Sequence, residues 1–410
     1  MDRTILHCDM NGFYASVELL ALPELKGKPM AVCGNPENRH GIILAKSEEA
    51  KAYGIVTAET VWQAKKKCPG LILVRPHHEK YSSYSKKINQ IYERFTDQIE
   101  PFSIDESWLD VTGSLRLFGS GKEIGDRIRA IVREELGLTL SVGVSYNKVF
   151  SKMGSEYKKP DATTVITRDN YKDILWPLPL RELFFVGRVT AEKLEKTGMR
   201  TIGDLAVYNR NLVCSMLGKQ GAVIHDYANG NDDSPVSLSY ERQKIKSVGN
   251  GMTFKRDLSG INDIKTAILA LSDTVAGRLR KYEMKCQGVK VDIKDPLFKT
   301  ISRQKQLPLV TNLAEDIGNE VLELIRKSWN LKEPIRMLTI TAIGLTDEQE
   351  AEQLSLFAIE QKDRERSETI ERTLDNIRRK YGGSAITFGG IINNDIGIDL
   401  YDQEEDVTFD

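Results

Sequence analysis

The sequence is poor in the residues that build disulfide frameworks and zinc sites. Its five cysteines are far apart and include no Cys-x-x-Cys pair: Cys8, Cys33, Cys68, Cys214 and Cys286. We interpret them as buried thiols of a protein in a reducing compartment. No apolar run approaches the ~18–20 residues that a membrane-spanning helix needs. The N-terminus carries an acid and leads directly into a strand-like run, unlike a signal peptide. We therefore expect a cytoplasmic protein without a membrane partner.

An overall excess of positive charge is missing as well, because the net charge is −1. The distribution along the chain is nevertheless uneven. Residues 348–410 hold 16 acids and 7 bases, whereas residues 241–347 hold 19 bases and 13 acids. A positive body with an acidic tail is compatible with DNA binding. Ordinary solvated surface charge explains the same numbers, so charge alone does not decide between the two.

A chain of 410 residues is too long for one compact core, so we expect two to four domains. Residues 1–166 show the order strand, helix, two strands, helix, strand of a ferredoxin-like βαββαβ sheet. The amphipathic helix of its first crossover is marked by aromatic and aliphatic residues between 81 and 95. Residues 23–76, with several prolines and glycines, form a small subdomain inserted into that crossover.

The remaining chain changes character twice. After residue 177 short helices broken by glycines are predicted, and residues 229–243 are polar and resemble a linker. The following segment, 244–347, predicts a second α+β domain with three strands around two helices. The fold class is therefore α+β and multidomain. The last residues are acidic, with one helix expected over 364–381.

Three carboxylates stand at the ends of predicted strands. Asp9 ends the first strand, and Asp105 and Glu106 occupy the turn between two others. The first strand of a ferredoxin-like sheet is central and neighbours the hairpin, so Asp9 and Asp105 can come close. Carboxylates on rigid strand ends suit Mg²⁺, which also binds substrate phosphates and water. The alternative, a strand-end cap and a solvated turn, stays open on spacing alone.

Three segments, taken together, resemble the motifs of the Y-family, or translesion, DNA polymerases. They are residues 8–18 (CDMNGFYASVE), residues 102–112 (FSIDESWLDVT) and residues 141–148 (SVGVSYNK), the last followed by Lys159 and Pro160. They occur in the family's order, and within the family they are nearest to its bacterial DNA polymerase IV group. The resemblance extends to about residue 347.

The resemblance implies a right-handed polymerase. Its parts would be a ferredoxin-like palm, small fingers, a helical thumb with a helix–hairpin–helix, and an α+β little finger. The implied bounds are palm 1–22 and 77–166, fingers 23–76, thumb 167–233, linker 234–243, little finger 244–347 and an acidic tail 348–410.

The resemblance also implies roles for individual residues. Asp9, Asp105 and Glu106, with the backbone carbonyl of Met10, would hold two Mg²⁺ ions. Tyr14 would exclude the 2′-hydroxyl of a ribonucleotide, because a flat ring under the sugar leaves no space for it. The nucleotide triphosphate would be contacted by Lys159, Lys51 and Phe13.

The chain departs from the family pattern at several positions. Asn11 stands where many members carry an acid. The fingers have Glu48 and Lys51 where the family typically offers Tyr and Arg to the triphosphate. Lysine lacks the bidentate fork of arginine, so Lys51 is the weaker candidate. In the thumb hairpin, Val189 takes the place we assign to the second glycine, which predicts a degraded, mainly structural hairpin.

The acidic tail contains a pentapeptide, residues 353–357 (QLSLF), that resembles the peptide by which bacterial polymerases dock on the sliding clamp. Its docking residues would be Gln353, Leu354, Leu356 and Phe357. The resemblance to the Y-family further implies a low-fidelity DNA polymerase without proofreading, and we expect a monomer. Its partners would be primer–template DNA, deoxynucleoside triphosphates and the sliding clamp. Two alternatives are a catalytically weak polymerase-like scaffold in a DNA-damage response complex and a two-metal nuclease.

Overall fold

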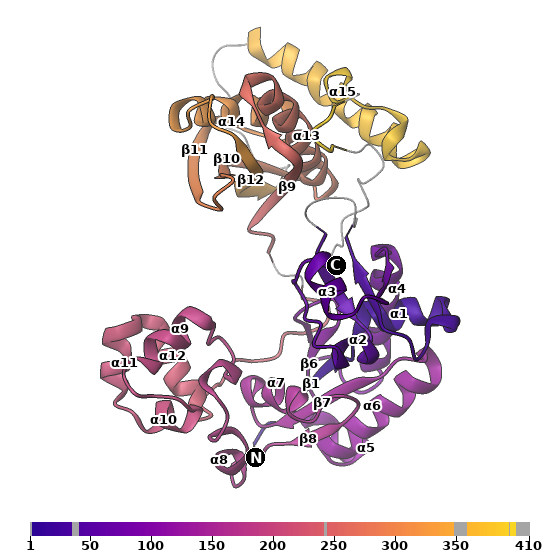
Figure 1. The fold of residues 1–410 in the computed structure, drawn as a ribbon, viewed down its shortest axis with the longest axis vertical. Coiled ribbons are helices and arrows are strands. Elements are labelled where there is room, and N and C mark those ends of the chain that lie inside the picture. Colours follow the sequence, from indigo (N-terminus) through magenta and orange to yellow (C-terminus); the bar gives the residue numbers. More distant parts are fainter. Residues whose placement is uncertain (1, 35–40, 242–243, 348–358, 393, 399–410) are drawn as a thin grey trace. The chain divides into compact units, whose positions relative to one another are not determined.

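The computed structural model describes residues 2–34, 41–241, 244–347, 359–392 and 394–398. Figure 1 shows its helices and strands along the chain. The chain divides into two compact units. The described residues up to 241 form the first unit, and the described residues from 244 onward form the second. Within the described residues, no helix is long and apolar enough to cross a membrane.

Five strands form the sheet that the sequence predicts for residues 1–166. Their order is β5-β6-β1-β7-β8, and β1 pairs antiparallel with both β6 and β7. This is the ferredoxin-like arrangement, with β8 added in parallel beside β7. The predicted central place of the first strand is thus confirmed. The strands are β1 (Ile5–Met10), β5 (Ile99–Pro101), β6 (Glu106–Asp110), β7 (Leu140–Ser145) and β8 (Thr163–Val165).

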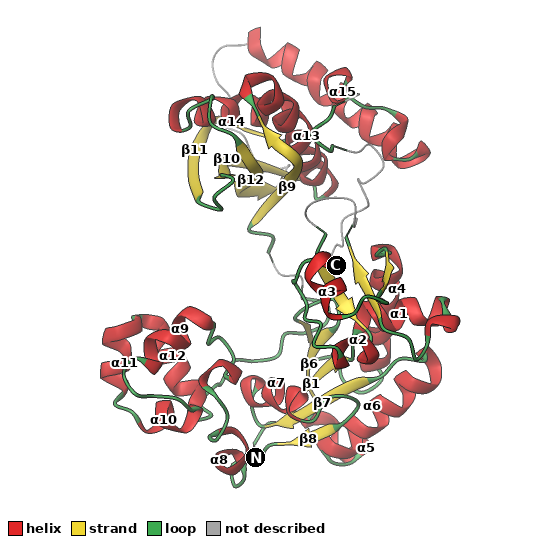
Figure 2. Cartoon of the chain, viewed as in Figure 1, coloured by secondary structure: helices red, strands yellow, loops and turns green. Residues whose placement is uncertain are grey.

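Helices pack on both faces of this sheet (Figure 2). Alternate residues of β1 point to opposite faces, as in any strand. Leu6, Cys8 and Met10 join the buried cluster formed with three helices, whereas His7 hydrogen-bonds to Ser155 of a fourth helix, α7. The three helices are α1 (Phe13–Ala21), α4 (His78–Tyr92) and α6 (Gly121–Leu136), and α7 spans Lys148–Tyr157. The short α5 (Leu115–Phe118) precedes α6.

Residues 23–76 form the small inserted subdomain. Its three-stranded sheet has the order β3-β2-β4, with β2 antiparallel to β3 and parallel to β4. The α3 helix begins with a capping box between Thr60 and Gln63, which satisfies backbone N–H groups of its first turn. The elements are β2 (Met30–Cys33), β3 (Ile43–Lys46), α2 (Glu48–Ala52), α3 (Val61–Lys67) and β4 (Ile72–Val74).

Five helices follow the sheet in the first unit. Their side chains share one buried cluster with Val149 and Phe150 of α7. In the hairpin before α9, Phe185 has a backbone φ of 67°, a left-handed conformation that is rare for a bulky residue. Phe185 therefore occupies a backbone position of the hairpin that favours glycine. The helices are α8 (Tyr171–Leu175), α9 (Arg188–Glu195), α10 (Ile202–Val207), α11 (Arg210–Leu217) and α12 (Lys219–Ala228).

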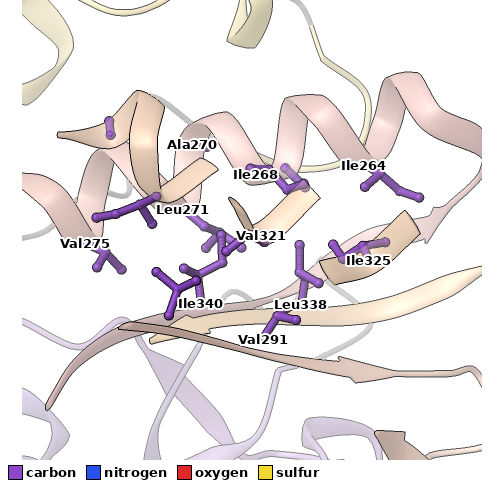
Figure 3. Close-up of a cluster of buried hydrophobic side chains, with 14 of the residues drawn as sticks. Ile264, Ile268, Ala270, Leu271, Val275, Val291, Val321, Ile325, Leu338 and Ile340 are labelled. Atoms are coloured by element: carbon purple, nitrogen blue, oxygen red, sulfur yellow. The ribbon is translucent and has the colours of Figure 1, made fainter. Parts of the chain in front are cut away.

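The second unit is a four-stranded sheet of order β11-β10-β12-β9 with two helices on one face. Figure 3 shows the core, where side chains of α13 and α14 meet those of the strands, such as Val291 and Leu338. The sequence did not predict β11, whose side chains are mostly exposed. The elements are β9 (Ser247–Leu258), α13 (Gly260–Lys281), β10 (Met284–Lys294), β11 (Thr300–Thr311), α14 (Ala314–Ser328) and β12 (Ile335–Asp347).

The described residues after 358 do not form the separate acidic tail that we predicted. They begin with α15 (Ile359–Tyr381), and the later Ile391, Ile396 and Ile398 are buried in the core of the second unit. The side chain of Arg280 on α13, only 4% exposed, bonds to Glu371 and Asp375 of α15. The acidic composition of this segment did not reveal that α15 packs against α13, because part of its acidic charge is paired with a buried arginine.

We expect Arg280→Leu to destabilise the second unit. The substitution leaves Glu371 and Asp375 next to an apolar side chain, and breaking a buried ion pair from one side costs about 3 kcal/mol. The free energy of unfolding, measured by urea titration with circular dichroism, checks this. Lys281→Leu on the same helix, at an exposed position, is the matched control. An equal urea midpoint for Arg280→Leu and its parent would show that this pairing does not hold α15.

Candidate active site

The site is built where the C-terminal end of β1 pairs with the start of β6, in the middle of the sheet. Asp9 lies opposite Glu106 in the antiparallel register, and its side chain is only 5% exposed. Because residues alternate along β1, Asp9 shares a face with His7 and lies opposite the core residues Cys8 and Met10. The sheet therefore brings two of the three predicted carboxylates side by side.

Asp105 lies in the turn just before β6. The backbone N–H of Met10 donates to the Asp105 carbonyl at 3.1 Å, which ties this turn to the end of β1. The hydroxyl of Ser103 donates to Asp105 Oδ1 at 2.6 Å. Glu106 is the first residue of β6 and not part of the turn. The two neighbouring acids therefore differ in setting: Asp105 is held by its own turn and Glu106 by the sheet.

A third acid, which the sequence analysis missed, joins the site from α7. Ligand oxygens of Asp9, Glu106 and Glu156 all lie within 4.8 Å of one another. Asp105 is not a member of this group, which was found among the described residues. A sequence signal for Glu156 does exist. Lys152, Ser155, Glu156 and Lys159 recur at helical spacing and predict one polar face near the end of α7.

Two lysines neutralise these carboxylates. Lys159 Nζ lies 2.7 Å from Asp9 Oδ2 and 2.7 Å from Glu156 Oε1. Lys152 hydrogen-bonds to Glu106. Lys159, predicted to contact a triphosphate, thus reaches the carboxylate cluster, and Lys152 is a second cation that the sequence analysis did not identify.

Burial controls the electrostatics of the site. It raises the pKa of Asp9 to about 8, against the opposing effect of the Lys159 ammonium, and it raises the pKa of Asp105 as well. Burial acts on Glu106 in the same direction, but hydrogen bonds with His7 and Lys152 outweigh it and hold the pKa near 2. Buried carboxylates close together favour a bound cation, which would stabilise their charged forms. Carboxylate oxygens are also the ligands that Mg²⁺ prefers, so the donor set fits a divalent metal site.

His7 lies beneath Glu106. Its Nε2 is 3.5 Å from Glu106 Oε2, and its Nδ1 is 2.8 Å from the Ser155 hydroxyl. The ring is fully buried, and burial lowers its pKa to about 4. The ring therefore connects β1 to α7 by a hydrogen bond and lies in contact with Glu106 of β6.

Tyr14 and Phe13, at the start of α1, have different surroundings. The ring of Tyr14 is half-buried and stacks on Tyr81, with centroids 3.9 Å apart and planes at 13°. Burial and the nearby Asp105 carboxylate raise the pKa of Tyr14. The Tyr81 hydroxyl donates to the buried Glu18 at 2.6 Å, one turn beyond Tyr14 on α1. Phe13, in contrast, is buried in the core, so its side chain is not available to a triphosphate as predicted.

Two predicted contacts remain, that of Lys51 with the triphosphate and that of the docking peptide with the clamp. Lys51 on α2 is largely exposed and lies 3.6 Å from Glu48, so its charge is partly compensated within the helix. The predicted docking peptide, Gln353, Leu354, Leu356 and Phe357, lies outside the described residues.

Comparison with known proteins is consistent along the chain. The model of the impB/mucB/samB family matches residues 8–156, the model of its C-terminal domain matches residues 245–356, and an HHH motif of the family matches residues 168–199. The chain belongs to the impB/mucB/samB family. Its relatives include DNA polymerase IV of Acetivibrio thermocellus, which is 45% identical over 398 residues, 97% of this chain and 99% of the relative.

Further relatives agree. DNA polymerase IV of Clostridium kluyveri is 39% identical and covers 96% of this chain and 99% of its own. A solved Y-family DNA polymerase chimera matches with a TM-score of 0.74 at 23% identity, over 84% of this chain and 99% of the chimera. The predicted Y-family membership and right-handed polymerase fold, with palm, fingers, thumb and little finger, are thus confirmed. The chain is a DNA-directed DNA polymerase of a metal-dependent family.

Proposed function

We propose that this polymerase extends the 3′ end of a primer by two-metal phosphoryl transfer, as a low-fidelity translesion enzyme without proofreading. The observation that carries the proposal is the placing of Asp9 near the end of β1, Glu106 on β6 and Asp105 in the turn before β6. Asp9 and Glu106 face each other across the sheet, and the turn of Asp105 is bonded to Met10. These are the positions at which the family motifs place the metal ligands.

In this proposal Asp9, Asp105 and Glu106, with the Met10 carbonyl, hold two Mg²⁺ ions. When bound, such ions activate a 3′-hydroxyl and neutralise the charge on the leaving pyrophosphate. The protein's own part is to hold the ligands on strand ends, so that little reorganisation is needed during the reaction. Lys159 and the more exposed Lys51 supply positive charge for the triphosphate, and Phe13 contributes through its backbone.

Asp105→Ala or Glu106→Ala should lower primer extension by on the order of a hundredfold or more, because an electrostatic element of the reacting centre is lost. Binding of primer–template DNA should remain within about twofold, since phosphate contacts elsewhere carry it. Extension with Mg²⁺ and four deoxynucleotides, together with fluorescence anisotropy of labelled DNA, measures both. Glu134→Ala, an exposed acid on α6, is the matched control. Either site variant extending at near the parent rate would refute the assignment.

Tyr14 is the proposed sugar gate. Its ring is held against Tyr81 and lies near Asp105, so a nucleotide bound at the carboxylates would place its sugar close to this ring. A ring fixed by stacking cannot move aside for an added 2′-hydroxyl at low cost.

We expect Tyr14→Ala to incorporate ribonucleotides at least about tenfold more readily, which corresponds to removing a steric penalty of roughly 1.4 kcal/mol or more. Deoxynucleotide incorporation should persist. The ratio of kcat/KM for a deoxynucleotide and its ribonucleotide is the measurement. Tyr84→Ala on α4 is the control for loss of an aromatic ring in the same domain. An unchanged ratio would place the gate at another residue.

Recruitment by the sliding clamp is the second part of the proposal, and it rests on the sequence of residues 353–357. A short peptide loses ordering entropy on binding, so its isolated affinity should be modest, about micromolar. A clamp that encircles DNA acts by raising the effective concentration of the enzyme at the primer end.

Replacing Leu356 and Phe357 with alanine should leave extension of a short free primer unchanged, because neither residue is among the proposed metal, sugar or triphosphate contacts. The same change should remove the stimulation by clamp loaded on a long template. Product length with and without clamp, on a circular primed template, gives the comparison. Ser355→Ala, within the peptide but outside the four docking positions, is the control. Equal stimulation of double mutant and parent would exclude this peptide as the contact.

A further inference from the structure

The end of α7 presents two ammonium groups to the carboxylates of the sheet. Lys152 bonds to Glu106, and Lys159, two residues beyond the helix, bonds to Asp9. Glu156 lies between them in sequence and accepts the second hydrogen bond of Lys159 at 2.7 Å. The family motifs assign no role to Glu156.

The position of Glu156 is fixed by close contact between α7 and the sheet. A Cβ on Gly143 of β7 would lie 1.8 Å from the carbonyl oxygen of Ser151, so helix and strand touch backbone to backbone. Ser155, next to Glu156, is bonded to the buried His7. The backbone that carries Glu156 therefore has little freedom, although half of its side chain is exposed.

This geometry creates a competition at Asp9. A divalent cation bound to Asp9 would meet the Lys159 ammonium at hydrogen-bond distance from the same carboxylate. Two cations this close repel each other strongly in a partly buried site. Lys159 must therefore leave Asp9 when the ion binds, and Glu156 already holds its other hydrogen bond.

We propose that Glu156 is a positioning residue. It retains the Lys159 ammonium at the rim of the site when a divalent cation replaces it at Asp9, and so directs Lys159 to the incoming triphosphate. This inference rests on the proposed function of the site, and it adds a defined partner for the triphosphate lysine. Glu156 itself need not bind the ion.

Binding of Mn²⁺ alone to the full chain, without DNA or nucleotide, tests the first step. Free Mn²⁺ is counted by electron paramagnetic resonance for the parent, Glu156→Gln, Lys159→Met and the double mutant. Lys159→Met should bind Mn²⁺ more tightly, because the competing ammonium is gone. Glu156→Gln should bind it about three- to tenfold more weakly, the effect of one partly exposed charge-assisted hydrogen bond.

The double mutant separates positioning from direct ligation. If Glu156 acts through Lys159, adding Glu156→Gln to Lys159→Met should change Mn²⁺ affinity by less than about twofold. An equal loss of affinity in both backgrounds would make Glu156 a metal ligand and overturn the proposal. Circular dichroism melting verifies that each variant is folded.

Nucleotide kinetics test the second step. Glu156→Gln should raise the KM for a deoxynucleotide about three- to tenfold while kcat stays within about twofold, since Lys159 is misplaced but the reacting centre is intact. Glu156→Asp keeps the charge and should lie between the parent and Glu156→Gln. Glu134→Gln is the control for loss of an exposed acid.

The outcomes distinguish the two levels of the proposal. A parent enzyme that extends primers, combined with a Glu156→Gln variant of unchanged KM and unchanged Mn²⁺ affinity, would refute the role of Glu156 alone. A folded parent that does not extend primers with Mg²⁺ would refute the proposed function itself.

Discussion

The antiparallel register of β1 and β6 is the constraint on which the site depends. It places Asp9 opposite Glu106 and, on the other face of β1, turns Leu6, Cys8 and Met10 into the core. A slip by one residue would exchange the two faces, burying Asp9 among apolar side chains and exposing the core. The same hydrophobic pattern that folds the domain therefore also sets the spacing of the carboxylates. One strand register therefore determines both the packing of the core and the geometry of the site.

Burying the charged carboxylates of Asp9 and Glu106 costs free energy unless nearby positive groups offset the loss of water. Asp9 is almost inaccessible, and its raised pKa reflects the loss of water around its charge. Lys159 and Lys152 offset part of that cost by standing against Asp9 and Glu106. Lys152 comes from α7 and Lys159 from the residues just after it, on the face of the sheet opposite the main core of the domain. The site is therefore completed only when both layers have packed. Close contact at Gly143 makes that packing possible.

Much of this arrangement was predictable from sequence because periodicity and motif agreed. The first strand, predicted to end at Asp9, and the amphipathic helix marked by residues between 81 and 95 follow simple hydrophobic patterns, and they form as β1 and α4. The missed parts carry no such pattern. Strand β11 is polar, largely exposed and contains Pro308, so it is defined by its neighbour β10. Glu156 was missed because its importance depends on the packing of α7, and the motif position of Phe13 does not reveal that its side chain is buried.

The second unit corrects an inference drawn from charge totals. The described acidic residues between 364 and 398 do not form a separate acidic tail, because several of them pair with arginines of the second unit. Asp375 and Glu371 bond to Arg280, and Asp395 bonds to Arg256 at 2.5 Å. Arginines that are paired in this way are not available to bind a phosphate group. Exposed basic side chains such as that of Arg303 on β11 carry charge that remains available to a polyanion, and attraction of this kind is screened by salt. Local pairing, and not the net charge of a segment, decides which surface can meet a polyanion.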